Sequence, residues 1–184
     1  MAKILLHACC AVCAGYPLDL LREEGFEPVV YFFNPNIHPK QEYDRRLAEL
    51  VRYCKKQNIE LIIEEEPCDG WFEFVKGLEK EPEKGLRCHK CFEYRLMKTA
   101  KKAKELGIEQ FTTTLFVSPH KVRNDIIAEG QKAANAYGVE FLDKDFRKKD
   151  GFLKTMKIAK AENFYRQTYC GCKFSIRKEI VTMP

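Results

Sequence analysis

The most informative stretch of the sequence is Lys3-Ile-Leu-Leu-His-Ala-Cys-Cys-Ala-Val-Cys13, in which a short apolar run leads without a break into three cysteines. An apolar run of about 5 to 6 residues predicts one buried β-strand. Reactive side chains directly after a strand are typical of open α/β sheets, which present their chemistry at the carboxyl edge. Two other cysteine groups, Cys88-His-Lys-Cys91 and Cys170-Gly-Cys172, lie far along the sequence. Folding that brings the three groups together would make a thiolate-bound metal centre.

The segments after this strand alternate between helix and strand patterns. We expect strands at 28–33, 60–64, 110–116 and 139–142, and helices at 17–25, 39–58, 88–106 and 122–137. In the first of these helices, Pro17 would stand in the first turn. Such alternation favours parallel strands joined by right-handed crossovers. The sequence therefore predicts an α/β, Rossmann-like fold in a single domain, 1–184, with about five mostly parallel strands flanked by helices.

Two segments depart from this alternation. Residues 65–87 carry an aromatic motif and a charged, proline-bearing loop, which indicates a lid-like insertion near the strand ends. Residues 144–184 form a basic tail that is helical in patches and contains the last cysteine pair.

Composition narrows the class of protein. The chain has 184 residues, a formal net charge of +5 and nine cysteines. An odd number of cysteines, some adjacent and some at C-x-C spacing, suits metal binding better than a disulfide framework. The opening apolar run is far shorter than the roughly 20 residues that span a bilayer, so we expect a cytoplasmic protein. The modest positive charge permits nucleic-acid binding without demonstrating it.

Seven of the cysteines fall into the three groups and are the expected metal ligands: Cys9, Cys10, Cys13, Cys88, Cys91, Cys170 and Cys172. A four-cysteine zinc site made from two C-x-x-C pairs is the simpler alternative. The two pairs are separated by far more than the roughly 15 to 20 residues of common zinc ribbons. A soft, all-thiolate site of this size also suits an iron–sulfur cluster with thiols left for a second metal. Cys54 faces the apolar side of its helix and is expected to be an inert core thiol.

The motifs together resemble the epoxyqueuosine reductases of the QueH type, over almost the whole chain. The resemblance rests on His7-x-Cys-Cys-Ala-x-Cys13, Asn34-Pro-Asn-Ile-His-Pro39 with Glu42, Tyr43 and Arg46, Arg87-Cys-x-x-Cys91 with Arg95-Leu96, Phe111-Thr-Thr-Thr-Leu115 with Ser118-Pro119 and Lys121, and Tyr165-Arg-Gln167 leading to Tyr169-Cys-Gly-Cys-x-x-Ser175.

This resemblance implies a fold similar to the HUP or PP-loop group, with cysteines in the place of a phosphate loop. It implies a 4Fe–4S cluster with an adjacent mononuclear iron, and reductive removal of the epoxide oxygen of epoxyqueuosine in tRNA. That reaction needs two electrons, a Lewis acid on the oxygen and protons to release it as water. The implied partners are therefore tRNA, through its anticodon region, and an electron donor.

Further side chains are candidates for catalysis or substrate contact. Cys13 and Asp69 are the expected catalytic residues; Asp69 would ligate iron or deliver a proton, or else cap the helix that contains Trp71. His7 is expected to be a core histidine or to support a ligand. The residues expected to contact substrate or tRNA are His38, Tyr43, Arg46, Thr113, Ser118, Lys121, Arg147, Lys148, Lys149 and Arg166. The basic tail combines charge with aromatic rings, as binders of single-stranded RNA do.

Two functions from other classes remain open at this point. One is an iron–sulfur tRNA thiolation enzyme that uses ATP, which would need a phosphate loop not found in the sequence. The other is a zinc-stabilised RNA-binding module without catalytic activity.

Overall fold

Five parallel strands form the central sheet of the protein, whose computed structural model describes residues 1–176. The strands are β1 (Ala2–His7), β2 (Phe26–Phe32), β3 (Leu61–Ile63), β4 (Gln110–Thr113) and β5 (Glu140–Phe141). Their order in the sheet is β3-β2-β1-β4-β5, and every neighbouring pair is parallel. The α/β, Rossmann-like sheet predicted from the sequence is confirmed.

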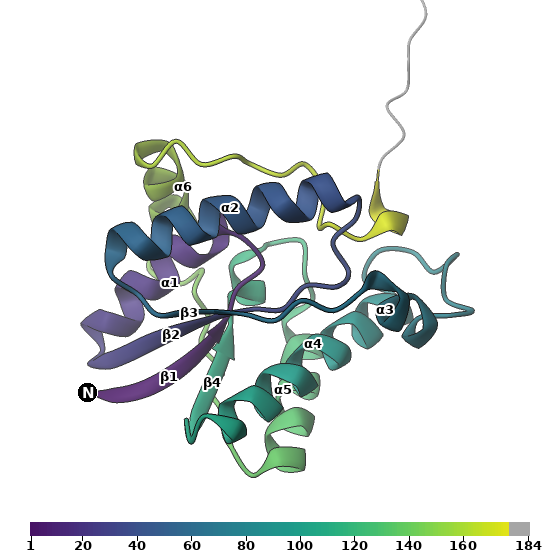
Figure 1. Ribbon diagram of the computed structural model, residues 1–184, viewed down its shortest axis with the longest axis horizontal. Helices are drawn as coiled ribbons and strands as arrows, with labels where there is room; N and C mark the ends of the chain where they lie inside the picture. The colour runs from purple at the N-terminus through teal and green to yellow at the C-terminus, as the bar shows by residue number, and fades with distance from the viewer. Residues whose placement is uncertain (177–184) are drawn as a thin grey trace, which may run out of the picture.

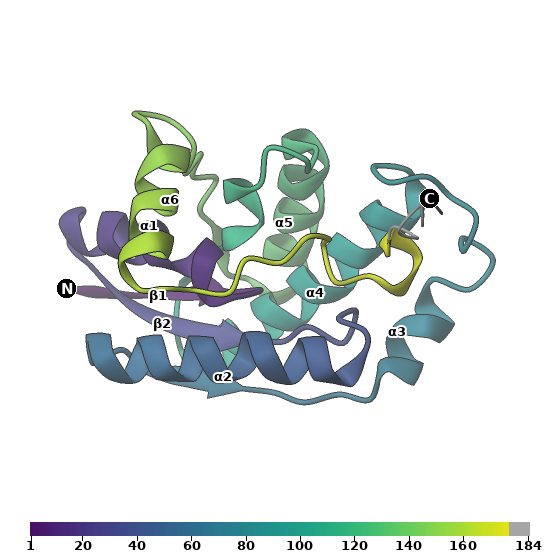
Figure 2. The same ribbon diagram turned by 90° about the horizontal axis from the view of Figure 1, so that it is seen from above.

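Helices cover both faces of this sheet. They are α1 (Ala11–Glu23), α2 (Lys40–Gln57), α3 (Cys68–Phe74), α4 (Leu86–Glu105), α5 (Arg123–Tyr137) and α6 (Gly151–Ala161). Figure 1 shows α1, α2 and α6 above the sheet and α4 and α5 below it. Seen from above, α6 lies beside α1, and α3 lies beyond the strand ends near α4 (Figure 2). The chain moves along the sheet in one direction from β1 to β3 and in the opposite direction from β3 to β5, so right-handed crossovers place α1 and α2 on one face and α4 and α5 on the other.

Burial of apolar side chains explains why these elements form. Ile4, Leu5 and Leu6 are fully buried because β1 is the central strand and is covered on both faces. In α2, Leu50 and Tyr53 face the core while most of the charged residues face solvent, as expected of an amphipathic helix; Glu42 and Arg46 are the buried exceptions. These contacts hold the carboxyl ends of β1 and β4 side by side, where the cysteines begin.

Helix α1 differs from the sequence prediction. It begins at Ala11 rather than at Pro17, so Pro17 lies inside the helix and its placement in the first turn is wrong. The Cys10 side chain caps the helix by accepting a hydrogen bond from the Cys13 amide, 3.4 Å away. All eight residues from Ala11 to Leu18 are buried, so this part of the helix packs inside the core. Cys13 is therefore held in the first turn of a rigid helix rather than in a loop.

Strand β4 is shorter than predicted. It ends at Thr113, and Thr114–Val117 form a 3₁₀ turn instead of the last part of a strand. The Thr113 hydroxyl accepts a hydrogen bond from the Leu115 amide at 3.2 Å, which turns the backbone out of the sheet. This turn carries the threonine hydroxyls toward the cysteines that follow β1.

The two segments that interrupt the alternation lie at the same end of the sheet. The expected insertion, 65–87, contains α3 and a loop that leads into α4. Of the expected tail, α6 and an extended stretch up to a short 3₁₀ turn at Lys173–Ser175 are described, whereas 177–184 lie outside the described residues. Treating the whole chain as one domain with a lid and a tail stays a prediction. Within residues 1–176, no helix combines the length and the apolar character needed to cross a membrane.

Candidate metal centre

The sheet places the opening cysteines at its topological switch point. β1 pairs with β2 on one side and with β4 on the other. Open α/β sheets bind ligands in the crevice outside the strand ends at such a point. Cys9 and Cys10 follow β1 almost directly, so their thiols lie at this crevice.

Cys9, Cys10 and Cys13 form the N-terminal thiol group, in which all three Sγ atoms lie within 4.8 Å of one another. All three cysteines are buried, and the Sγ atoms of Cys9 and Cys10 are 3.9 Å apart. Hydrogen bonds from the Cys10 and Cys13 thiols hold the pKa of Cys9 well below its ordinary value. The Cys10 and Cys9 thiols, together with burial, raise the pKa of Cys13. The three thiols interact directly, and a metal ion that displaces their protons would bind there.

His7 and two threonines, Thr113 at the end of β4 and Thr114 directly after it, pack beside this group and support it. His7 is fully buried, and its Nδ1 lies 2.9 Å from Thr113 Oγ1 while its Nε2 lies 3.2 Å from the Phe33 carbonyl oxygen. Because the carbonyl can only accept, Nε2 carries the proton and Nδ1 accepts from the threonine hydroxyl. Burial, followed by the charge of Arg95, lowers the pKa of His7 to about 3. His7 is thus a neutral side chain that supports the group. The Thr114 hydroxyl accepts a hydrogen bond from the Cys9 amide at 3.3 Å.

The other four cysteines form the outer thiol group: Cys88, Cys91, Cys170 and Cys172. Cys88 and Cys91 lie in the first turns of α4, while Cys91 and Cys172 pack against the buried Trp71 of α3. Burial raises the pKa of Cys88 and of Cys91, and the charge of Cys170 acts in the same direction on both. The Cys172 thiol is the main cause that lowers the pKa of Cys170 to about 5. Burial therefore outweighs the stabilisation of thiolate that a helix N-terminus gives to Cys88 and Cys91.

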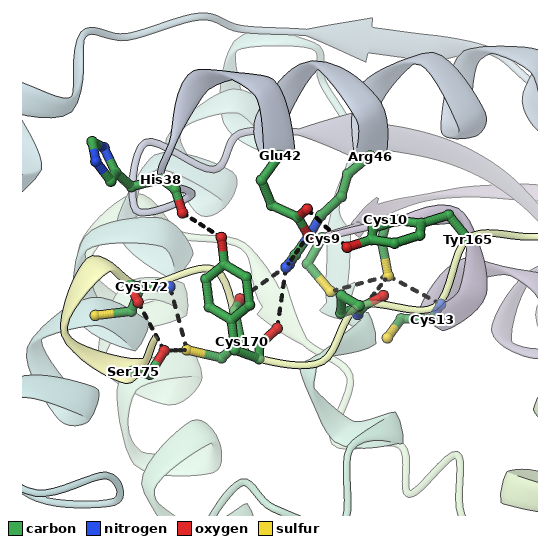
Figure 3. Close-up of polar contacts among 12 residues, drawn as sticks. Cys9, Cys10, Cys13, His38, Glu42, Arg46, Tyr165, Cys170, Cys172 and Ser175 are labelled. Atoms are coloured by element: carbon green, nitrogen blue, oxygen red, sulfur yellow. Dashed lines mark hydrogen bonds and ion pairs between the residues drawn. The ribbon is translucent and has the colours of Figure 1, made fainter. Parts of the chain in front are cut away.

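One cavity of about 640 Å³ joins the two thiol groups. Five of the seven expected ligands line it: Cys13, Cys88, Cys91, Cys170 and Cys172. Gln167 also lines the cavity and donates a hydrogen bond to Cys10 Sγ at 3.2 Å, which ties the tail to the N-terminal group. Figure 3 shows the N-terminal group on one side and Cys170 and Cys172 on the other. The three distant cysteine motifs thus meet at one end of the sheet.

Two buried arginines stand in the wall of this cavity. Arg87 and Arg95 are 2% and 3% exposed, and both line the cavity. Arg87 donates to the carbonyls of Leu78 and Glu79, at 3.2 and 3.0 Å, but its buried Nε has no partner. Arg95 donates to the Cys91 carbonyl and to Asn34 Oδ1, each at 3.3 Å. In the described part of the chain, no carboxylate forms an ion pair with either guanidinium.

The residues expected to contact substrate or tRNA fall into three sets. Ser118, Lys121 and Arg166 line the cavity. Arg147, Lys148 and Lys149 lie outside its lining, just before α6, with the two lysines exposed. His38, Tyr43, Arg46 and Thr113 are at least partly buried in the supporting structure. Their roles in substrate binding stay predictions.

The residues of the third set make contacts with other parts of the protein. Tyr43 is 7% exposed and packs edge-on against Phe32, and burial raises its pKa to about 12. The His38 imidazole points away from the thiols, while its backbone contacts the cysteine loop (Figure 3). Arg46 is 2% exposed.

Asp69 is not brought together with the thiols. It lies exposed in the first turn of α3 and is absent from the cavity lining. Pro67 is the N-cap of α3 and no side chain caps the helix, so the capping role considered for Asp69 is wrong. A catalytic role for Asp69 stays a prediction. Cys54, by contrast, is buried in α2, where burial raises its pKa to about 12, as expected for an inert core thiol.

Sequence reasoning assigned no role to four residues that shape the site. They are Glu42, Arg87, Arg95 and Gln167. A usable signal was present for Arg95: it follows Cys91 by one helical turn, so both lie on the same face of α4, where a charge is out of place. No local pattern indicates that Gln167 would reach Cys10.

Comparison with known proteins gives one consistent result. The sequence model of the family described as "Epoxyqueuosine reductase QueH" matches residues 4–178. The epoxyqueuosine reductase QueH of Acinetobacter baylyi is 42% identical over 176 residues, covering 95% of this chain and 81% of that protein. That of Histophilus somni is also 42% identical, over 95% of this chain and 72% of its own length.

A solved structure shows a similar fold. It is a predicted subunit of tRNA methyltransferase from Methanocaldococcus jannaschii, which aligns with a TM-score of 0.59 at 10% sequence identity. The alignment covers 98% of this chain and 100% of the other. At that identity the likeness concerns the fold alone.

Proposed function

The chain belongs to the epoxyqueuosine reductase QueH family, and on that premise we propose that its thiol-lined cavity is where the epoxide of epoxyqueuosine in tRNA is reduced. Membership makes the chain an oxidoreductase that acts on tRNA. The product is the cyclopentene of queuosine, and an electron donor supplies two electrons. The observation that carries the proposal is the convergence on one cavity of two thiol groups and two buried arginines that have no ion-pair partner among residues 1–176.

The charges of the cavity wall fit an anionic metal centre. A buried guanidinium without a counter-charge is costly, and Arg87 and Arg95 are two of them beside the outer thiol group. A cluster bound by four thiolates carries net negative charge and would supply the missing partner. A neutral, protonated set of thiols would not. The donor set is also all sulfur, which suits iron–sulfur clusters.

Geometry suggests how the thiols divide between two metal groups. Thiolates that share one tetrahedral ion, each about 2.3 Å from it, lie ~3.8 Å apart. The 3.9 Å between Cys9 and Cys10 Sγ matches that spacing, so we assign the N-terminal group to the single iron. The outer group offers four thiols, the number that a 4Fe–4S cluster takes. When bound, the two groups supply one-electron transfer and a Lewis acid for the epoxide oxygen.

The protein's own residues position the substrate. Lys121 and Arg166 line the cavity and offer positive charge to the phosphates on either side of the modified base. Neutral His7 and the threonine hydroxyls keep Cys9 in place without adding charge. Trp71 and Phe92 close the cavity with apolar surface and exclude water from the reacting carbons.

Metal and sulfide analysis of anaerobically purified protein tests this assignment. We expect brown protein with ~5 irons for ~4 acid-labile sulfides, because a 4Fe–4S cluster and one further iron occupy the seven thiols. Mössbauer spectra would resolve the extra iron as a separate component. Equal iron and sulfide would remove the second iron from the proposal. Colourless protein with stoichiometric zinc would instead indicate a zinc-stabilised RNA-binding module.

Kinetics with whole tRNA test the role of the tail. Replacing both exposed lysines, Lys148→Gln with Lys149→Gln, should raise KM for tRNA several-fold and leave kcat nearly unchanged, since they supply sequence-independent phosphate contacts. KM should also rise steeply with salt in the unmodified protein. Lys55→Gln, an exposed lysine on α2, is the matched control and should change neither constant. If the protein reduced free epoxyqueuosine nucleoside as efficiently as tRNA, at a rate that does not depend on salt, this role would be ruled out.

A further inference from the structure

The loop Tyr169–Cys172 carries half of the outer thiol group but belongs to no helix or strand. Its backbone must therefore be held by other parts of the protein. The neighbouring α4, which carries Cys88 and Cys91, is a regular helix of 20 residues and needs no such support. What fixes the loop decides whether all four thiols face one point.

Arg46 of α2 makes the contacts that hold this loop. Its Nη1 donates to the Cys170 carbonyl and its Nη2 to the Tyr169 carbonyl, each at 3.1 Å (Figure 3). Its Nε donates to Glu42 Oε1 at 2.7 Å, one turn earlier on the same helix. The Arg46 side chain is 1% exposed, so the guanidinium is shielded from competing water. One planar group thus joins α2 to two successive residues of the cysteine loop.

The surroundings of Arg46 fix its direction. The other carboxylate oxygen of Glu42 accepts a hydrogen bond from the Tyr165 hydroxyl at 3.0 Å. The carboxylate is therefore held at both oxygens and keeps the guanidinium turned toward the loop. An ion pair buried this deeply is stable only when its remaining donors are satisfied, and here the two loop carbonyls satisfy them.

Gly171 allows the loop to approach this closely. Its φ of +106° is a backbone conformation that other residues rarely adopt, and a Cβ there would lie 2.9 Å from Ile37 Cγ1 and 3.2 Å from Arg46 Nη1. The Gly171 carbonyl accepts a hydrogen bond from the His38 amide at 2.8 Å, and the Tyr169 hydroxyl donates to the His38 carbonyl. The loop is thus bound on both sides of its glycine.

We infer that Arg46 is a positioning residue: with Glu42 it fixes the Cys170-Gly-Cys172 loop so that both thiols face the cavity. This inference rests on the proposed function in taking Cys170 and Cys172 as metal ligands. It gives Arg46 a part other than the substrate contact expected from the sequence. Lysine cannot replace it, because only a planar guanidinium reaches two carbonyls and a carboxylate at once.

Hydrogen–deuterium exchange on the anaerobically purified protein tests the loop contacts directly. In Arg46→Lys, which keeps a positive charge opposite Glu42, the amides of 166–172 and of His38 should exchange about tenfold faster. Amides of residues 50–57, farther along α2, should be unchanged, which separates the loop from a general loosening of the helix. Arg52→Lys is the matched control: Arg52 lies on α2 and donates to the Glu162 carbonyl at 3.0 Å, away from the thiols.

Iron lability and kinetics give the second readout. Arg46→Lys should lose iron to a chelator at least about tenfold faster than the unmodified protein and show an altered Mössbauer spectrum. Its kcat should fall while KM for tRNA stays unchanged, since Arg46 is buried and is absent from the cavity lining. If Arg46→Lys does not fold, Tyr165→Phe, which removes only the hydrogen bond to Glu42, should accelerate exchange at 166–172 to a lesser degree.

Two results would overturn the inference. One is that the amides of 166–172 exchange in Arg46→Lys at the same rate as in the unmodified protein. Where Tyr165→Phe is used instead, the same result in that variant would overturn the inference. The other is equal acceleration at 166–172 and 50–57, which would make Arg46 a residue of helix stability only. Absence of iron from the unmodified protein would instead refute the proposed function, and the exchange data would still report on Arg46.

Discussion

Serine in place of Cys13 is expected to lower turnover by more than about 100-fold, because even residues that only support metal ligands typically cost 10- to 100-fold when lost. Cys13 is the member of the N-terminal group that lines the cavity, so its sulfur is nearest to a substrate. A serine hydroxyl is a harder and far less acidic ligand, so it is a poor replacement for a thiolate on iron. The variant should also show a changed Mössbauer spectrum, with its binding of tRNA retained.

The same outcome is expected for each of the other six cysteines of the two thiol groups. Cys54→Ala is the control, since Cys54 is 1% exposed in α2 and outside the cavity. It should keep both the spectrum and the activity of the unmodified protein, at a modest cost in stability. Full activity in several of the seven serine variants would return those cysteines to a structural role.

Methionine in place of Arg95 is expected to weaken iron binding by about 100-fold, which corresponds to ~3 kcal/mol, the lower range for removing one partner of a buried charge pair. Arg95 is 3% exposed beside Cys91 and has no carboxylate partner among residues 1–176. Among the described residues its charge therefore has no carboxylate counter-ion, and the proposed metal centre would supply the counter-charge. Chelator competition measures the loss of affinity.

Two comparisons make this result specific to the charge of Arg95. Arg95→Lys keeps the positive charge and should retain most of the iron. After chelation, Arg95→Met should unfold at a temperature no lower than the chelated unmodified protein, because it no longer buries an unpaired charge. Iron held as tightly by Arg95→Met as by the unmodified protein would show that the cavity does not need this cation.

Local sequence patterns predicted most of the fold because they indicate which side chains are buried. The apolar run of β1, the β-branched and aromatic run of β2 and the one-sided apolar face of α2 are each visible within a few residues. The two errors, the start of α1 and the end of β4, both occur where a side chain caps the backbone. Cys10 caps α1 and Thr113 turns the chain out of β4. Such hydrogen bonds depend on local backbone geometry and leave little trace in hydrophobic periodicity.

By itself the sequence determined that the protein is an α/β sheet with seven thiols in three motifs, and which family it resembles, since strand rhythm and cysteine spacing are both local properties. Only the tertiary structure showed that the thiols of Cys9, Cys10 and Cys13 lie within 4.8 Å of one another, and which buried charges have no ion-pair partner among residues 1–176. The contacts that hold the cysteine segments in place join distant residues: Arg46 donates to the Cys170 carbonyl, and Gln167 donates to Cys10 Sγ. Residue types limit what a side chain can bind, but the backbone atoms and charges it meets depend on how the whole chain folds.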